Sequence, residues 1–218
     1  DMLEVGIPSS DPVGDGPVIQ AAAERALRQG ATPAQCFELL RAFRARHPNV
    51  PVGILTYANI VVARGRSAFY RATAEVGVDS VLVADVPVFE AEPFVAAAEE
   101  AGIAPVLIAA SNTPEAMIVR IAAYGAGYTY CVARAGVTGA GDQLALNHSD
   151  LFRMLAKYGA PPPVLGFGIS RPEHVRQALD SGAAGVISGS AIVRLIEQNR
   201  DDPAAAVRAF VTEMKAAG

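Results

Sequence analysis

One acidic side chain interrupts an apolar run near the start of this 218-residue chain, where Glu4 stands between Leu3 and Val5. The alternation predicts a strand over Met2–Gly6 with Glu4 on the opposite face from its two neighbours. Desolvation raises the pKa of a carboxyl group that faces a protein interior. Glu4 is therefore a candidate general acid or base near neutral pH. A structural carboxylate, hydrogen-bonded to a Ser, Thr or Tyr of a neighbouring strand, fits the same pattern.

Two further carboxylates, Asp11 and Asp15, follow in a loop rich in proline and glycine. Asp11 precedes Pro12 and could form an Asx-turn. Asp15 precedes Gly16 and Pro17 and could cap the helix that begins there. The pattern by itself favours these structural roles over chemical ones, without excluding either.

Two glycine motifs late in the chain predict a phosphate site. Gly166 and Gly168 follow one apolar run, and Gly189 with Ser190 follows the next. Glycine lets the backbone approach an anion closely, and the N–H groups at a helix N-terminus point toward it. Ser190 could cap its helix and donate its hydroxyl to a phosphate oxygen. A third glycine-rich segment, Arg134–Asp142, is longer than a usual strand-to-helix connection and is typical of a lid.

Short apolar runs alternate with helical patterns along the whole chain. Several runs are almost continuously apolar, as in parallel strands covered on both faces. The predicted strands are Met2–Gly6, Val52–Thr56, Ser80–Ala84, Ala104–Ala109, Tyr128–Val132, Val164–Phe167 and Gly185–Ser188. Hydroxyl residues close to an early proline, at Thr32, Thr113 and Ser170, mark three helix starts.

Strict alternation of strand and helix predicts a parallel sheet, either open or closed into a barrel. Glycine signals after the last strands favour the α/β class of the TIM (β/α)8 barrel, with seven of the eight strands visible in this chain. We expect one barrel domain over residues 1–218.

Composition excludes several classes. Lys and Arg number 18 against 22 Asp and Glu, for a net charge of −4, so nothing indicates a nucleic-acid partner. No apolar stretch is long enough for a membrane span and no signal-peptide pattern is present. Cys36 and Cys131 lack ligand-spaced neighbours, which argues against a zinc site or disulfide scaffold and suits a reducing cytoplasm. No lysine falls in a predicted strand to form a Schiff base, and the three histidines lie in surface-like contexts.

Taken together, these motifs resemble the tryptophan synthase alpha subunit family. The segments that carry the resemblance occur in the family's order and reach from the first strand to the last helices. They are LEVGIPSSDPVGDGPVIQ (3–20), LTYANIV (55–61), VLVADVP (81–87), YTYCVARAGVTGA (128–140), GFGIS (166–170) and GVISGSAIV (185–193).

The resemblance implies a lyase of tryptophan biosynthesis that cleaves indole-3-glycerol phosphate to indole and glyceraldehyde 3-phosphate. It implies no metal or organic cofactor, and it implies a beta subunit as partner in an alpha2beta2 complex. Glu4 matches the family's acid–base glutamate, and Asp15 matches the aspartate that holds the indole N–H. Tyr130 matches the hydroxyl-bearing tyrosine near that glutamate.

The remaining site residues also come from the resemblance. The indole pocket would be lined by Leu55, Tyr57 and Ile108, with Thr138 in the lid. The phosphate would be held by Gly139, Gly166, Gly168, Gly189 and Ser190. The rim that meets the beta subunit would include Asp11, Pro12 and Asn59.

The chain departs from the family pattern in places. Ser9 replaces a bulky aromatic residue and Gly14 replaces a common alanine, and both changes should loosen the loop before Asp15. The family's first strand is not found; its place would lie between Met2–Gly6 and Gly185–Ser188. A non-catalytic module that docks on a beta subunit, and another phosphate-binding barrel enzyme, are the alternatives. A turnover assay with and without a beta subunit separates the first from a lyase.

Overall fold

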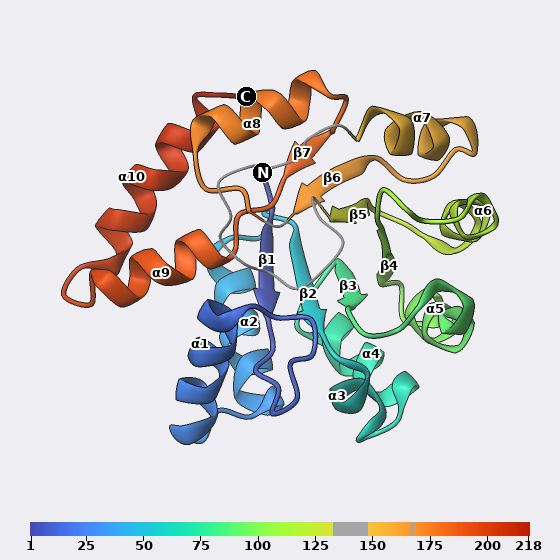
Figure 1. Ribbon diagram of the computed structural model, residues 1–218. Coiled ribbons are helices and arrows are strands. Elements are labelled where there is room, and N and C mark those ends of the chain that lie inside the picture. The colour runs from blue at the N-terminus through green and yellow to red at the C-terminus, as the bar shows by residue number, and fades with distance from the viewer. Residues whose placement is uncertain (133–147, 167) are drawn as a thin grey trace.

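The computed structural model of the protein describes residues 1–132, 148–166 and 168–218. Within these ranges, seven parallel strands lie in one curled sheet in their sequence order (Figure 1). The strands are β1 (Leu3–Gly6), β2 (Val52–Thr56), β3 (Ser80–Val83), β4 (Ala104–Ala109), β5 (Thr129–Val132), β6 (Pro163–Gly166) and β7 (Gly185–Val186). The predicted alternation is confirmed, and the arrangement is that of a (β/α)8 barrel with seven of its strands present.

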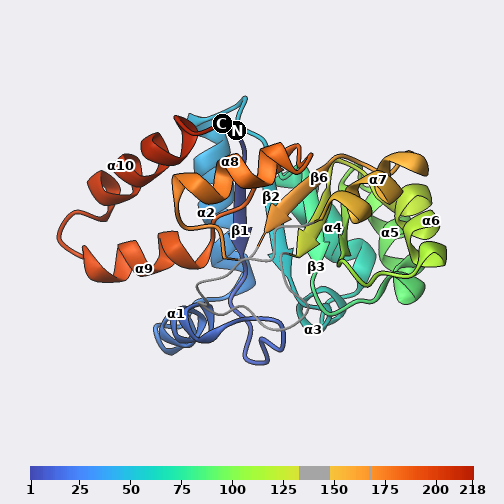
Figure 2. The same cartoon turned by 45° about the horizontal axis from the view of Figure 1, so that its top comes forward.

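Helices follow the strands and surround the sheet, as the turned view also shows (Figure 2). They are α1 (Pro17–Arg28), α2 (Pro33–Arg46), α3 (Ala58–Val62), α4 (Arg66–Glu75), the 3-10 turn η1 (Val88–Glu90), α5 (Glu92–Glu100), α6 (Glu115–Tyr124), α7 (Ser149–Lys157), α8 (Pro172–Asp180), α9 (Ser190–Gln198) and α10 (Pro203–Lys215). Among the described residues, no helix is both long and apolar enough to cross a bilayer.

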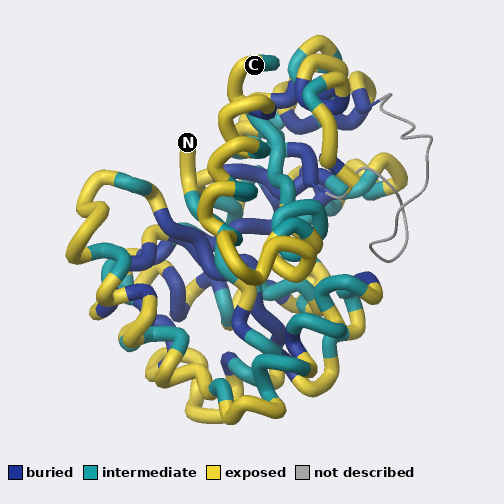
Figure 3. The backbone as a smooth tube through the Cα atoms, turned by 90° about the vertical axis from the view of Figure 1, so that its left-hand side faces the viewer, coloured by how far each residue is buried: buried dark blue, intermediate teal, exposed yellow. Residues whose placement is uncertain are grey.

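The two faces of the sheet build separate cores, because side chains alternate along each strand. The outer face packs under the helices, as Ile54 and Leu165 do with exposed fractions of 1% and 0%. The inner face holds a smaller cluster around Leu82, Val106 and two tyrosines. Burial accordingly concentrates on the sheet, and exposed residues on the outer helices (Figure 3).

Strands β2 and β4 have the predicted bounds, and the ends of the other strands differ from prediction by at most two residues. The largest difference is in β7, which ends at Val186 where the prediction extended to Ser188. Among the described residues, the backbone bond furthest along between the two final strands runs from Ile187 N to Leu165 O at 2.9 Å. Beyond this bond the chain turns into α9, so the apolar run of the sequence is longer than the strand that it forms.

One of the three predicted helix starts has the expected cap. Thr32 accepts a hydrogen bond from Gln35 N and completes a capping box at α2. Helices also begin at the other two predicted starts, but there the N-caps are Pro114 at α6 and Arg171 at α8 and not the hydroxyl residues. Thr113 Oγ1 instead accepts from Ala110 N at 2.8 Å, which stabilises the preceding turn.

The described sheet has two edge strands, β1 and β7. Helix α1, which follows β1, packs against α9, which follows β7. Arg25 of α1 forms an ion pair with Glu197 of α9, with 3.0 Å between nitrogen and oxygen. The expectation of a single barrel domain with one further strand in this position stays a prediction.

Candidate active site

Glu4 lies on the inner face of the sheet, in register with Gly53 of β2. Tyr128, just before β5, donates a hydrogen bond from Oη to Glu4 Oε1 at 2.5 Å. Burial raises the pKa of Glu4, and the Tyr128 hydrogen bond lowers it by a smaller amount. Because burial dominates, Glu4 can hold a proton closer to neutral pH than an exposed glutamate can.

Gly53 makes room for this pair. A Cβ at Gly53 would lie 2.9 Å from Ser80 Oγ and 3.8 Å from Tyr128 Oη. Any larger residue would therefore press on the polar side chains at this end of the inner face. The small residue on β2 allows a tyrosine and a glutamate from distant parts of the chain to meet.

Tyr128 is the residue that sequence reasoning missed. The resemblance names Tyr130 as the tyrosine near Glu4, and the structure adds Tyr128, whose hydroxyl is hydrogen-bonded to the Glu4 carboxyl group. The two tyrosines are two positions apart and both face inward, so strand alternation could have identified both. Burial raises the pKa of Tyr130, and so do the negative charges of Glu4 and Asp15, which places its hydroxyl within electrostatic reach of both carboxylates.

Asp15 lies in the loop after β1 and is half-buried, close enough for its charge to act on the inward Tyr130. It is not the helix cap that the sequence left open, because the N-cap of α1 is Gly16 and no side chain caps that helix. Burial raises the pKa of Asp15, and its interaction with the Tyr57 hydroxyl lowers it in part. Tyr57 Oη is buried and has no hydrogen-bond partner of good geometry within the described residues.

The two residues expected to loosen the loop that carries Asp15 differ in their surroundings, and the loosening itself stays a prediction. Ser9 is 5% exposed, and its Oγ accepts a hydrogen bond from Asp11 N at 3.1 Å. A Cβ at Gly14 would make ordinary contact with Tyr57 Oη at 3.5 Å. Ser9 therefore orders the turn locally, while Gly14 leaves its neighbour Tyr57 uncrowded.

Two apolar residues named for the indole pocket, Leu55 and Ile108, lie on the inner face with Tyr130. Ile108 is directly beside Tyr130 in the β4–β5 register. Tyr57 follows β2 and is 2% exposed. The structure thus brings Leu55 and Ile108 to the same inner side of the sheet as Glu4.

The two glycine motifs follow the neighbouring strands β6 and β7. Gly168 has φ of +81°, a backbone conformation that favours glycine. Gly189 is the N-cap of α9 and Ser190 its first residue, so Ser190 is not the cap that its sequence position suggested. A Cβ at Gly189 would meet no atom of the described residues within 4 Å, so these residues leave the space beside this helix N-terminus open. Thr138, Gly139 and the predicted lid 134–142 lie outside the described residues.

The rim residues follow β1 and β2, which are adjacent strands. Asp11 and Asn59 are exposed and Pro12 is half-buried. Asn59 is the second residue of the short helix α3, after Ala58. The Ala58 N–H donates a hydrogen bond to Asp85 Oδ1 at 2.7 Å. The carboxyl-end loops of β2 and β3 are therefore linked at this rim.

Two of the three histidines are buried, which corrects the surface expectation. His148 is 2% exposed, and its Nε2 lies 3.2 Å from Val132 O. His174 is 8% exposed and its Nδ1 accepts from Ser170 N at 3.2 Å. Both stand at helix starts that pack against strand ends, a setting that the local sequence does not reveal.

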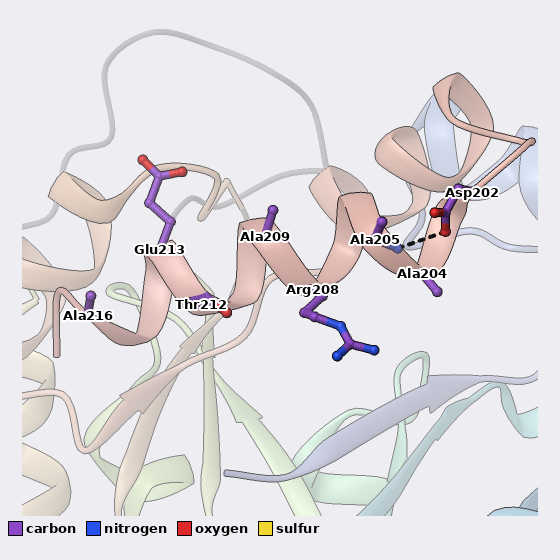
Figure 4. Close-up of a pocket in the computed structure, with 8 residues that line it drawn as sticks. All are labelled: Asp202, Ala204, Ala205, Arg208, Ala209, Thr212, Glu213 and Ala216. Atoms are coloured by element: carbon purple, nitrogen blue, oxygen red, sulfur yellow. Dashed lines mark hydrogen bonds between the residues drawn. The ribbon is translucent and has the colours of Figure 1, made fainter.

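Away from this site, a hollow of about 620 Å³ follows one face of α10 (Figure 4). It is lined by Asp202, Ala204, Ala205, Arg208, Ala209, Thr212, Glu213 and Ala216. None of the candidate site residues borders it. In the described part of the chain, no group of three His, Cys, Asp or Glu side chains is arranged to hold a metal ion.

The family described as tryptophan synthase alpha chain matches residues 1–217. The tryptophan synthase alpha chain of Klebsiella pneumoniae subsp. pneumoniae is 55% identical over 220 residues, which cover 100% of this chain and 82% of that protein. The chain of Escherichia fergusonii is 54% identical with the same coverage.

Solved structures agree. The chain from the tryptophan synthase a2b2 complex of Pyrococcus furiosus has a TM-score of 0.89 and 34% identity, covering 99% of this chain and 86% of that one. Subunit alpha of Legionella pneumophila has a TM-score of 0.87 and 30% identity, covering 100% and 81%. With this sequence match along its length and the same arrangement of strands and helices, the chain belongs to the tryptophan synthase alpha chain family.

Proposed function

We propose that Glu4 and Asp15 carry the alpha reaction in this protein, with Tyr128 and Tyr130 beside them. As a member of its family the chain is a lyase of tryptophan biosynthesis, and the alpha reaction cleaves indole-3-glycerol phosphate to indole and glyceraldehyde 3-phosphate. The observation that carries the residue assignment is the inward Glu4, whose pKa burial raises and whose carboxyl oxygen Tyr128 holds at 2.5 Å.

The chemistry needs two proton movements. Protonation of indole C3 by the Glu4 carboxyl group makes the ring an electron acceptor. The resulting Glu4 carboxylate then takes the proton of the hydroxyl on the adjoining glycerol carbon. The C3–C3′ bond breaks, its electrons return to the ring, and the hydroxyl-bearing carbon becomes the aldehyde.

Asp15 stabilises the charge that builds on the ring during this step. When C3 is protonated, positive charge spreads to the ring nitrogen, and a carboxylate accepting the N–H hydrogen bond favours that state. The buried Tyr57 and the apolar Leu55 and Ile108 supply the surface for the indole ring.

The phosphate group is assigned to the loops that follow β6 and β7. Gly166 and Gly168 border the first, and Gly189 with Ser190 begins α9 in the second. Backbone N–H groups at such a helix start bind an anion well. Thr138 and Gly139 stay proposed on the resemblance alone. Binding energy from the phosphate, remote from the bond that breaks, holds the reacting carbons at Glu4.

A beta subunit is the proposed partner, at the rim formed by Asp11, Pro12 and Asn59. The relative from Pyrococcus furiosus belongs to an a2b2 complex. We further propose a cytoplasmic location, as suits a biosynthetic enzyme with two free cysteines.

Turnover tests the proposal directly. The purified chain is incubated with indole-3-glycerol phosphate, alone and with a tryptophan synthase beta subunit, and both products are measured. We expect indole and glyceraldehyde 3-phosphate in equal amounts, released by the chain alone. Activation of the beta subunit with no indole release in either mixture would instead support the non-catalytic module.

A further inference from the structure

The two proposed phosphate loops are joined by a side chain that no assignment above includes. Ser188 lies between β7 and α9, and its Oγ donates a hydrogen bond to Ile169 O at 2.7 Å. Ile169 belongs to the loop between β6 and α8. The bond therefore connects the two segments whose backbone N–H groups would hold one phosphate.

This bond lies beyond the end of β7. The strand β7 has only two residues, and the backbone bond from Ile187 N, just after it, reaches Leu165 O. One residue later the Ser188 hydroxyl reaches Ile169, four positions beyond Leu165. It extends the connection from the sheet into the loops themselves.

One end of the bond is buried in a core cluster, and the other end lies beside an exposed glycine. Ile169 is 2% exposed and packs in the outer core with Val175 and Ala178 of α8. Gly189, directly after Ser188, is exposed, with open space at its Cβ position. The hydroxyl thus anchors the start of α9 to a fixed carbonyl of the neighbouring loop.

We propose that Ser188 is a positioning residue for phosphate recognition: its hydrogen bond to Ile169 O holds the α9 N-terminus at the correct distance from the Gly166–Gly168 loop. This inference rests on the proposed function. Ser188 acts through the backbone groups of its neighbours, because its own hydroxyl proton is engaged by Ile169. Preorganised donors bind an anion better than donors that must be ordered on binding.

The test compares Ser188→Ala with Ser188→Thr and with Ser181→Ala. Ser181 is a matched control, since its Oγ also donates to a backbone carbonyl, Ala178 O, at 2.7 Å, but at the far end of α8. Calorimetry on the full chain measures dissociation constants for indolepropanol phosphate and for indolepropanol, which lacks the phosphate.

We expect Ser188→Ala to weaken binding of the phosphate compound roughly tenfold, the effect of one lost hydrogen bond. Binding of indolepropanol should change less than about twofold on the same reasoning. Ser188→Thr, which keeps the hydroxyl, and Ser181→Ala should both retain the wild-type ratio of the two constants.

Two results would overturn this inference and leave the proposed function standing. Ser188→Ala could weaken the binding of both compounds equally, or it could weaken the binding of neither. If the wild-type chain bound indolepropanol phosphate no better than indolepropanol, the proposed phosphate site would fail, and this inference with it.

Discussion

The protein contains two glutamates hydrogen-bonded by a tyrosine, and their surroundings set them apart. Inside the sheet, Tyr128 donates to Glu4, whose pKa is raised because burial outweighs the hydrogen bond. On the outside, Tyr158 donates to Glu115 between α6 and α7, where Lys157 also binds the carboxylate at 2.8 Å. There the pKa of Glu115 is lowered by Lys157 and then by Tyr158, with little burial to oppose them.

The comparison teaches that the partner does not decide what a carboxyl group can do. A tyrosine hydroxyl favours the ionised form of both glutamates. At Glu4 alone of the two, desolvation in the inner cluster outweighs the tyrosine and raises the pKa. An acid–base group is therefore made here by position in the barrel, and the tyrosine limits how far its pKa rises.

The largest effect is expected when each glutamate is replaced. Glu4→Gln keeps the shape of the side chain but cannot transfer a proton, so cleavage should fall by about 10²–10⁴-fold. Glu115→Gln should leave it unchanged, because that side chain lies on the outer surface. Steady-state release of indole measures both. Retention of activity within a few-fold in Glu4→Gln would exclude the acid–base assignment.

A second pair of carboxylates extends the comparison. Asp15 is half-buried and Asp11 is exposed, although four positions separate them. Asp15→Asn removes a charged hydrogen-bond acceptor from the indole nitrogen and should lower turnover roughly ten- to a hundredfold. Asp11→Asn should have little effect on the isolated chain in the same assay. Equal, small effects of the two substitutions would favour a structural role for Asp15.

Packing around the tyrosines gives a prediction of stability. A Cβ at Gly166 would overlap the Tyr130 hydroxyl, whereas a Cβ at Gly185, on the next strand, would meet nothing within 4 Å. Gly166→Ala should destabilise the fold by about 1–3 kcal/mol, the usual cost of overpacking. Gly185→Ala should cost much less. Urea unfolding measures both, and equal costs would show that Tyr130 can move aside freely.

The smallest expected effect concerns pH. The Tyr128 hydrogen bond lowers the pKa of Glu4, so Tyr128→Phe should raise that pKa further. The ionisation of Glu4 in the pH profile of turnover should then move to higher pH. Tyr158→Phe, at the exposed pair, should leave the profile in place. A shift to lower pH in Tyr128→Phe would mean that the hydroxyl does not stabilise the carboxylate.

Much of the site follows from local sequence patterns. Alternation around Glu4 predicts a strand with that carboxyl group facing inward, and glycine at 166, 168 and 189 marks loops that approach an anion. The strand around Glu4 is confirmed, because side-chain alternation is a property of a few consecutive residues. The anion-binding role of the glycines stays a prediction. Family resemblance added the reaction and the roles of the residues.

Other features depended on the tertiary structure. Tyr128 meets Glu4 across 124 positions of sequence, and Ser188 meets Ile169 across 19. His148 and His174 are buried although their local sequence looks exposed. Such contacts depend on how far each strand extends into the inner cluster and where neighbouring strands stop pairing. The sequence by itself therefore determined which residue types stand at the strand ends. Only the folded chain decided which of them touch, because burial and contact distance are set by elements far apart in sequence.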